Sequence, residues 1–236
     1  MSSTTVSCIL AVYNGRKYLA EALKSLCTQS RSIDEIIVVD DGSTDDTAEI
    51  AQRYGSPVRC IRQNNAGQSA ARNHGVRASR GEFLSFLDCD DLIHPKKIER
   101  QLARFAEAPQ LMLIDAYAQN FWSPDIPQEQ RQLDGLQATT HSDQPWPEFI
   151  ATWLFRRELW NRVGEFDEGR KFSEDSDWRD RVQCSGMPIE TMPAVLARRR
   201  LHQNNLTRNN FREHVDGLRR FYKEKLDRQR DKRNAS

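Results

Sequence analysis

The sequence predicts an α/β fold, in which an open and mostly parallel sheet is flanked by helices on both sides. Two observations lead to this prediction. Short apolar segments rich in β-branched residues alternate with segments of helical periodicity, and this alternation repeats four times before about residue 107. A regular strand–helix alternation is typical of a parallel sheet covered by helices. The chain of 236 residues is long enough for one domain with an appendage.

The first half of the chain carries the regular part of this pattern. Strands are expected at 6–13, 34–40, 57–61 and 82–87. Helices are expected at 15–27, 43–54, 66–79 and from Pro95 to about 107. In the first helix Leu19, Leu23 and Leu26 form one apolar face. Ser43 and Asp46 resemble a capping box at the start of the second helix.

The pattern becomes irregular after Pro109. A strand is expected at 111–118, a long loop at 121–147, helices within 157–184 and short strands within 188–201. The tail from 209 has helical periodicity, with four apolar residues on one face: Phe211, Val215, Leu218 and Tyr222. We therefore expect a domain over 1–207, with halves 1–110 and 111–207, and a helical C-terminal extension over 208–236.

Composition excludes several classes of protein. The chain has 35 basic and 34 acidic residues, so its net charge does not indicate a nucleic-acid binder. Its five cysteines include no Cys-x-x-Cys pair, which argues against a zinc site or a disulfide framework. Reduced thiols and the lack of a recognisable signal peptide favour a cytoplasmic protein. No apolar run approaches the roughly 20 residues of a transmembrane helix, so at most a peripheral membrane contact is expected.

Carboxylates follow two of the predicted strands. Asp40 and Asp41 end the second strand, and Asp88, Asp90 and Asp91 end the fourth. In open parallel sheets the ligand binds outside the carboxyl ends of the strands. Carboxylates that lie this close repel one another unless a cation lies between them, and Mg²⁺ or Mn²⁺ prefers oxygen ligands. The pattern favours a metal-bridged phosphate substrate, although aspartates also cap helices in such turns.

A set of ordered motifs resembles one enzyme family. In order along the chain they are VSCILAVYNGRKYLAEALKSLCTQS, IIVVDDGSTDDT, NNAGQSAARNHGV, GEFLSFLDCDD, VGEFDE, SEDSDW and RRLHQNN. This set is similar to family 2 glycosyltransferases, which have the Rossmann-like GT-A fold. The resemblance is strong over 5–107 and resumes over 163–205. It implies an inverting hexosyl- or N-acetylhexosaminyltransferase that moves a sugar from a nucleotide sugar, most simply UDP-linked, to an acceptor hydroxyl.

The resemblance also implies which residues bind the nucleotide, all of them in the half over 1–110. They are Ala11, Tyr13, Asn14, Asp40, Asn65, Gly67, Arg72 and Asp88. The family usually has proline in place of Ala11. Asp40 matches the residue that contacts uracil, Asp88 the one that reaches the ribose, and Arg72 suits a bidentate phosphate contact. Tyr13 could instead be a core aromatic residue, and Arg72 a surface arginine.

The resemblance also implies which residues contact the metal and the sugar. Asp90, the second aspartate of the Asp-x-Asp motif, would bind Mn²⁺ or Mg²⁺, and Asp91 would orient its neighbours or the donor sugar. His202 could join the metal, because imidazole suits Mn²⁺ better than Mg²⁺, or could be a surface histidine. Trp153 lies in the zone that faces the acceptor in the family, but a core role is equally compatible with its sequence.

The motif SEDSDW provides the candidate catalytic base. Glu174 and Asp177 share one face of a helix, whereas Asp175 points elsewhere. Glycosyl transfer needs a base for the acceptor hydroxyl, and the resemblance makes Asp175 that base, with Asp177 next. All three carboxylates could instead stabilise the N-terminus of the helix through the helix dipole.

Several alternatives remain open at this stage. A nucleotidyltransferase also uses metal-bound aspartates, but no glycine-rich, lysine-containing motif follows the first strand. The chain could also be a non-catalytic nucleotide- or glycan-binding domain. Arg199 and Arg200 could neutralise the departing diphosphate or lie in a solvated turn. The other histidines are expected to be structural or on the surface: His74, His94, His141 and His214. The basic tail from Arg208 could touch an anionic membrane or form a solvated helix, and a homodimer is open.

Overall fold

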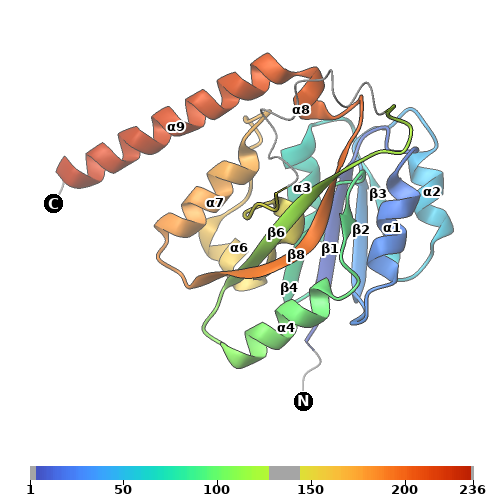
Figure 1. Ribbon diagram of the computed structural model, residues 1–236, viewed down its shortest axis with the longest axis horizontal. Coiled ribbons are helices and arrows are strands. Elements are labelled where there is room, and N and C mark those ends of the chain that lie inside the picture. Colours follow the sequence, from blue (N-terminus) through green and yellow to red (C-terminus); the bar gives the residue numbers. More distant parts are fainter. Residues whose placement is uncertain (1–3, 128–143, 235–236) are drawn as a thin grey trace.

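A computed structural model describes residues 4–127 and 144–234. In it the chain forms one twisted sheet with helices on both faces (Figure 1). The strands follow one another in the order β3-β2-β1-β4-β7-β6-β8-β5. Their bounds are β1 Val6–Val12, β2 Glu35–Asp40, β3 Val58–Arg62, β4 Phe83–Phe86, β5 Leu92–Ile93, β6 Leu113–Trp122, β7 Leu154–Arg156 and β8 Ile189–Leu201.

The helices cover this sheet and extend beyond it. Their bounds are α1 Leu19–Cys27, α2 Thr47–Arg53, α3 Gln68–Ala78, α4 Lys97–Glu107, the 3₁₀ turn η1 Ile150–Thr152, α6 Arg157–Val163, α7 Glu174–Cys184, α8 Leu206–Asn209 and α9 Phe211–Asn234. The predicted α/β class with a helical C-terminal extension is confirmed. None of the helices in the described ranges is long and apolar enough to cross a bilayer.

The sheet is mostly parallel. β3, β2, β1 and β4 run in the same direction, and β8 runs parallel to β6. β7 pairs antiparallel with β4 and β6, and β5 pairs antiparallel with β8. The carboxyl ends of the first four strands therefore meet at one edge, as the alternation in the sequence predicts. The antiparallel strand β7 lies between β4 and β6 and interrupts the otherwise parallel order of the sheet.

Local predictions fail where tertiary contacts replace the expected local ones. Ser43 does not cap α2, because its hydroxyl accepts a hydrogen bond from Asn14 N at 2.9 Å. α2 instead begins beside Asp45, whose carboxylate accepts from Thr47 N at 3.0 Å. The short strands expected within 188–201 form the single long strand β8, because β6 pairs along its length. Most of the loop predicted over 121–147, including His141, lies outside the described residues.

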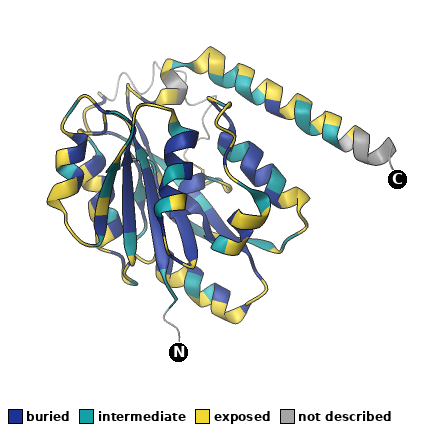
Figure 2. Ribbon diagram, turned by 180° about the vertical axis from the view of Figure 1, so that it is seen from behind, coloured by how far each residue is buried: buried dark blue, intermediate teal, exposed yellow. Residues whose placement is uncertain are grey.

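The core lies between the sheet and the helices on each face (Figure 2). One side is an aromatic cluster in which Trp153 stacks on Trp178 with ring centroids 5.4 Å apart. The ring centroid of Phe155 lies 5.1 Å from that of Trp178. Because Trp153 is 1% exposed, the expectation that it faces an acceptor is wrong. Burial of its ring in this cluster gives it a core role.

The C-terminal helix packs through a face other than the expected one. Phe221 is buried, whereas Phe211 and Tyr222, which were expected on one apolar face, are exposed. Gly217 allows the close approach, because a β-carbon there would lie 3.0 Å from Phe172 Cβ. α9 therefore packs beside the segment that leads into α7.

One lysine is buried in the core between β4 and α4. Lys97 Nζ donates hydrogen bonds to Ser85 Oγ at 2.9 Å and to the carbonyl oxygen of Trp153 at 3.1 Å. Burial lowers the pKa of Lys97 to about 8, against a smaller opposing effect of Cys8. The folded state therefore disfavours the ammonium form of this side chain.

This burial predicts a pH-dependent stability difference between the wild type and Lys97→Met. Between pH 8 and pH 10.5 the unfolded lysine binds a proton that the folded lysine does not. Raising the pH through this window should increase wild-type stability, relative to that of the variant, by about 3 kcal/mol. Urea unfolding at both pH values measures the difference. Lys24→Met, at an exposed lysine of α1, is the control, and a pH-independent difference for Lys97→Met would contradict the prediction.

Candidate active site

The carboxyl edge of the parallel strands gathers acidic side chains from distant segments. Asp40 ends β2, and the turn after β4 carries Asp88, Asp90 and Asp91. α7 begins at Glu174, and His202 follows β8 directly. Hydrogen bonds and ion pairs connect the last two segments to the turn after β4, as described below. The candidate residues from the two halves of the chain therefore meet at one place.

Asp40 offers a buried acceptor close to Arg62, which lines an open pocket. Its Oδ1 accepts from Ser43 N at 2.8 Å. Its Oδ2 has no hydrogen-bond partner among the described residues, and the nearest cation, Arg62 Nε, is 3.6 Å away. Buried acceptors are nearly always hydrogen-bonded, so this oxygen suits an N–H group of a ligand.

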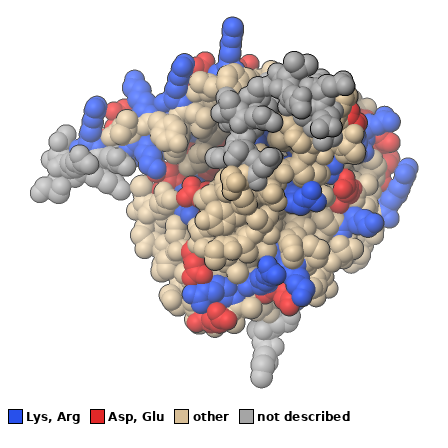
Figure 3. Space-filling model, viewed as in Figure 1, with Lys and Arg blue, Asp and Glu red and all other residues tan. Residues whose placement is uncertain are grey.

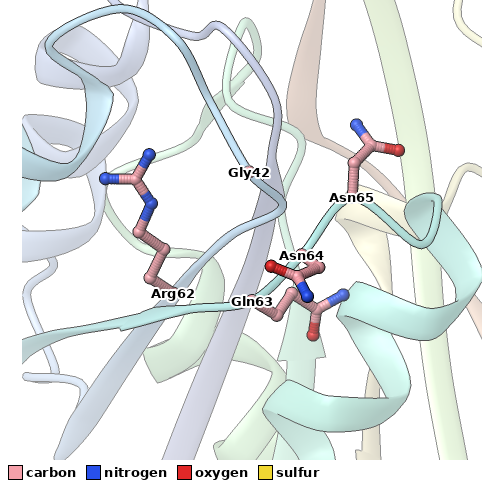
Figure 4. Close-up of a pocket in the computed structure, with 5 residues that line it drawn as sticks. All are labelled: Gly42, Arg62, Gln63, Asn64 and Asn65. Carbon is pink, nitrogen blue, oxygen red and sulfur yellow. The ribbon is translucent and has the colours of Figure 1, made fainter.

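The pocket next to Asp40 has a volume of about 600 Å³. Its lining residues are Gly42, Arg62, Gln63, Asn64 and Asn65, and in Figure 4 Arg62 and Asn65 lie on opposite sides of Gly42. A β-carbon at Gly42 would lie 2.9 Å from Asn65 N, and the residue has φ +78°. Only glycine therefore lets the two loops approach this closely. The predicted nucleotide residue Asn65 lines this pocket.

Asp41 holds the loop that carries Asn65 and Gly67. Its carboxylate accepts hydrogen bonds of 2.8 Å from Gln63 Nε2, Ala66 N and Gly67 N. Gly67, at φ +92°, then leads into α3. The sequence analysis placed Asp41 at the sheet edge but assigned it no role. Its position as the second aspartate of IIVVDD was the one signal available from the sequence. Asp41 shapes the pocket, whereas Asp40 is left with an unpartnered oxygen.

The turn after β1 completes this side of the site. Tyr13 is 53% exposed, so the alternative of a core aromatic residue is excluded. Asn14 adopts φ +52°, and its Oδ1 accepts from Thr44 N at 2.8 Å. Ala11 lies in β1 and packs against the small apolar cluster of Ile37 and Val39. Asn14 thus fastens the β1 turn to the turn after β2.

Arg72 joins the two halves of the candidate site. Its guanidinium donates to Asp88 Oδ1 at 2.6 Å and to Glu174 Oε1 at 2.7 Å. Burial alone would lower the pKa of Arg72, but the neighbouring carboxylates outweigh it and raise that pKa. Burial raises the pKa of Glu174 to about 7, and Asp175 adds to this effect. The guanidinium expected to grip a phosphate is engaged by two carboxylates and is not a surface arginine.

Asp90 and His202 form the candidate metal site. His202 Nε2 lies 2.8 Å from Asp90 Oδ2, and Asn205 Nδ2 is 3.4 Å from the same oxygen. His202 is buried, and its ring lies 4.7 Å from that of Tyr18. The described residues contain no group of three or more potential His, Cys, Asp or Glu ligands. One carboxylate and one imidazole fit a divalent ion whose remaining ligands are waters and substrate phosphates.

Arg200 supports the acidic turn. Its backbone N–H donates to Asp91 Oδ1 at 2.7 Å, and its Nε donates to the carbonyl oxygen of Asp90 at 2.8 Å. The same guanidinium pairs with Glu21 at 2.5 Å and is buried. Its contacts match neither a solvated turn nor a group exposed to a diphosphate. Burial raises the pKa of Asp91 well above its usual range, with Asp90 and Asp88 adding to the effect. Asp91 therefore has a supporting position.

The three carboxylates of α7 have different surroundings. Glu174 and Asp177 are buried, as the predicted helix geometry requires, and Asp175 is half-exposed. Asp177 accepts from Arg181 Nε at 3.0 Å. Asp175 accepts from the backbone N–H of Ser176 at 2.7 Å and forms no ion pair within the described ranges. Asp175 is thus the carboxylate of the three that remains available to a substrate.

One histidine near α7, expected from the sequence to be structural or on the surface, packs against the segment before this helix. The ring of His214, on α9, packs edge-on against Phe172 with centroids 5.7 Å apart. Its Nδ1 is buried and has no hydrogen-bond partner among the described residues. Burial lowers the pKa of His214, and the negative charge of Asp175 opposes this. No spacing signal in the sequence connects residue 214 with residue 175, because only the packing of α9 brings them together.

Solved structures of other proteins share this fold. The mannosyltransferase PcManGT from Pyrobaculum calidifontis, in complex with GDP-Man and Mn²⁺, gives a TM-score of 0.70 at 19% identity, over 94% of this chain and 64% of that one. S. aureus TarS 1-349 in complex with UDP-GlcNAc gives 0.68 at 22% identity, over 85% and 60%. The fold is therefore that of the GT-A glycosyltransferases.

Sequence comparison then specifies the family. Residues 7–164 match the model of glycosyl transferase family 2. The uncharacterized glycosyltransferase RT0329 of Rickettsia typhi is 33% identical over 96% of this chain and 74% of its own length. EpsH of Bacillus subtilis is 35% identical over 69% of this chain, and the match spans only 47% of EpsH. The chain belongs to glycosyltransferase family 2.

The central ion pairs predict a large stability effect for Arg72→Met. Removing the guanidinium leaves Glu174 buried without its partner, and we expect the free energy of unfolding to fall by about 3 kcal/mol or more. Urea denaturation measures this loss. Arg77 lies on the same helix as Arg72 and forms an exposed ion pair with Glu165. Arg77→Met removes this pair and should change the free energy of unfolding by less than about 1 kcal/mol. Equal effects of the two substitutions, or strict additivity of Arg72→Met with Glu174→Gln, would contradict this interpretation.

Proposed function

We propose that this family 2 glycosyltransferase transfers a sugar from a UDP-linked donor to an acceptor hydroxyl with inversion at the anomeric carbon. The observation that carries the proposal is the Asp88–Arg72–Glu174 connection. It holds Asp88, the aspartate proposed to contact the ribose, beside α7, whose second residue is the proposed base Asp175. Donor and acceptor groups can therefore meet at one edge of the sheet.

The donor pocket supports uracil as the base. Asp40 Oδ2 is a buried acceptor without a partner among the described residues, and the imide N–H of uracil is a matching donor. Guanine also offers an N–H, and the two solved neighbours bind different nucleotides. UDP is favoured because Asp40 is the last residue of β2, where the family motif assigns the uracil contact. Tyr13, which is exposed beside this edge, would pack on the base.

Asp175 is the proposed general base. It would take the proton of the acceptor hydroxyl while that oxygen attacks the anomeric carbon from the face opposite the diphosphate. Direct displacement of this kind inverts the configuration. Glu174 and Arg72 would keep the first turn of α7 in place, and Asp177, bound to Arg181, would support the same turn. The half-exposed position of Asp175 allows an acceptor to reach it.

The donor set of Asp90 and His202 fits a divalent cation, as described above. These two residues would hold Mn²⁺ or Mg²⁺, which would supply positive charge to the leaving diphosphate when bound. Asn205 and Arg200 would keep Asp90 oriented through its side chain and its carbonyl oxygen.

The remaining assignments follow from this reaction. The half over 1–110 would bind the nucleotide, the half over 111–207 would face the acceptor, and 208–236 would form the extension. The transferred sugar would be a hexose or an N-acetylhexosamine. All five cysteines are free, which supports a cytoplasmic location. A nucleotidyltransferase is disfavoured by membership of family 2, and the half-exposed Asp175 disfavours a non-catalytic binding domain.

The reaction predicts turnover with a defined dependence on Asp175. The protein with Mn²⁺, a panel of nucleotide sugars and candidate hydroxyl acceptors should release UDP from at least one donor. Asp175→Asn should retain donor binding and lose transfer by about 10²- to 10⁴-fold, the usual contribution of a general base. A coupled UDP-release assay and product mass spectrometry measure both.

Asp167→Asn is the matched control, because Asp167 is an exposed carboxylate a few residues before α7. It should retain the wild-type rate. UDP release from none of the donors, together with no metal-dependent UDP binding, would overturn the proposal. A wild-type rate in Asp175→Asn would instead move the base to Asp177. Transfer of a nucleotidyl group, seen by mass spectrometry, would favour the alternative class.

The metal site predicts that Asp90→Ala loses Mn²⁺-dependent UDP binding. Calorimetry with and without Mn²⁺ should show a loss of at least about tenfold in affinity for Asp90→Ala, and a smaller loss for His202→Ala. Asp46→Ala, at an exposed aspartate near the same edge, should bind as the wild type does. Identical Mn²⁺ dependence in Asp90→Ala would exclude Asp90 as a ligand.

A further inference from the structure

The C-terminal helix α9 is seated on the domain through one face. Lys225 Nζ and an Arg228 guanidinium nitrogen each lie 2.9 Å from Asp180 of α7. Glu224 pairs with Arg170, and Phe221 is buried beneath the helix. These contacts fix the rotation of α9 about its own axis. The side chains that point away from α7 are therefore fixed as well.

The helix presents an apolar stripe beside this seated face. Phe211, Tyr222 and Leu226 are 52%, 58% and 55% exposed. Residues 11 and 15 positions apart lie close to the same face of a helix, and the half-buried Val215 and Leu218 continue the stripe between them. Most large exposed apolar side chains in the described ranges lie within 206–226. A concentration of this kind marks an interaction surface.

A row of basic side chains runs alongside the stripe. Its members, spaced by seven, four and seven residues, are Arg212, Arg219, Lys223 and Arg230, all of them exposed. Asp216 and Asp227 lie on the same outward side and pair with Arg219 at 3.3 Å and with Arg230 at 3.9 Å. The exposed Arg220 adds a further positive charge, so basic groups predominate. Figure 3 shows Lys and Arg side chains standing along the outer edge of this helix.

We propose that this surface, the docking face of α9, lies on an anionic lipid bilayer. The helix has 24 residues and is therefore about 36 Å long. Lying in the plane of the interface, it would bury the apolar stripe among the acyl chains and place the basic row at the headgroup phosphates. A second copy of the chain fits less well, because two such faces in contact would bring their basic rows together.

The position of α9 gives this contact a consequence that rests on the proposed function. α8 and α9 follow the carboxyl end of β8, on the side of the sheet where the candidate site lies (Figure 1). The seated face of α9 also contacts α7, which carries Asp175. A bilayer against the docking face would bring the acceptor side of the site close to the lipid surface. An acceptor carried on a lipid would then reach Asp175 without leaving the membrane.

The test is co-sedimentation of the full chain with vesicles, which requires neither donor nor turnover. The wild type should pellet with vesicles of phosphatidylcholine and phosphatidylglycerol, remain in solution with phosphatidylcholine alone, and dissociate as salt is raised. Arg212→Gln with Lys223→Gln should weaken binding by about 30-fold, because each basic side chain contributes about fivefold at such a surface. Tyr222→Ser with Leu226→Ser should weaken it as well.

Arg53→Gln with Arg100→Gln, two exposed arginines on other helices, changes the charge equally and should bind as the wild type does. Thermal unfolding confirms that each variant is folded. Absence of binding to anionic vesicles, or equal losses in the control and the α9 variants, overturns the proposal. Sedimentation velocity without lipid shows whether Tyr222→Ser with Leu226→Ser abolishes a dimer instead, which would assign the face to a second copy. Vesicle binding without sugar transfer would refute only the proposed function.

Discussion

The candidate site depends on one guanidinium buried between two carboxylates. Arg72 projects from α3 and pairs with Asp88 after β4 and with Glu174 at the start of α7. Three segments that are distant in sequence are thereby held within the length of one side chain. Each carboxylate would be costly to bury alone, and the single cation stabilises both. In the proposed reaction this contact would set the distance between the donor groups at Asp88 and the acceptor groups at α7.

In the turn after β4, the repulsion between neighbouring carboxylates is reduced by a separate partner for each aspartate. Its three aspartates suggest a shared cation, yet each has a partner within the protein. Asp88 is bound by Arg72, Asp90 by His202, and Asp91 by the backbone of Arg200. The protein's own side chains and backbone therefore hold the shape of the turn, in keeping with preorganised sites. A metal that binds at Asp90 and His202 would replace their mutual hydrogen bond.

Much of the fold over residues 1–110 could be predicted because its signals are local. Apolar strands followed by polar turns indicated β1 to β4, and the parallel order placed Asp40 and Asp88 at one edge. Predictions failed where a distant residue competes for a local group. Ser43 accepts from Asn14 instead of capping α2. Trp153 carries a ring suited to a sugar, but its neighbours Trp178 and Phe155 bury it. No pattern in one segment reveals the segment that will pack against it.

The sequence by itself determined the fold class, the family and the identity of the carboxylates, because periodicity and motif order are properties of the chain alone. The tertiary structure decided which of those carboxylates are paired with arginines and which remain available to a substrate. Glu174, Asp175 and Asp177 look alike in SEDSDW. Burial and paired arginines engage the first and third, and the second stays half-exposed. Such differences arise from partners far along the chain, since the electrostatic surroundings of a side chain depend on distances in space.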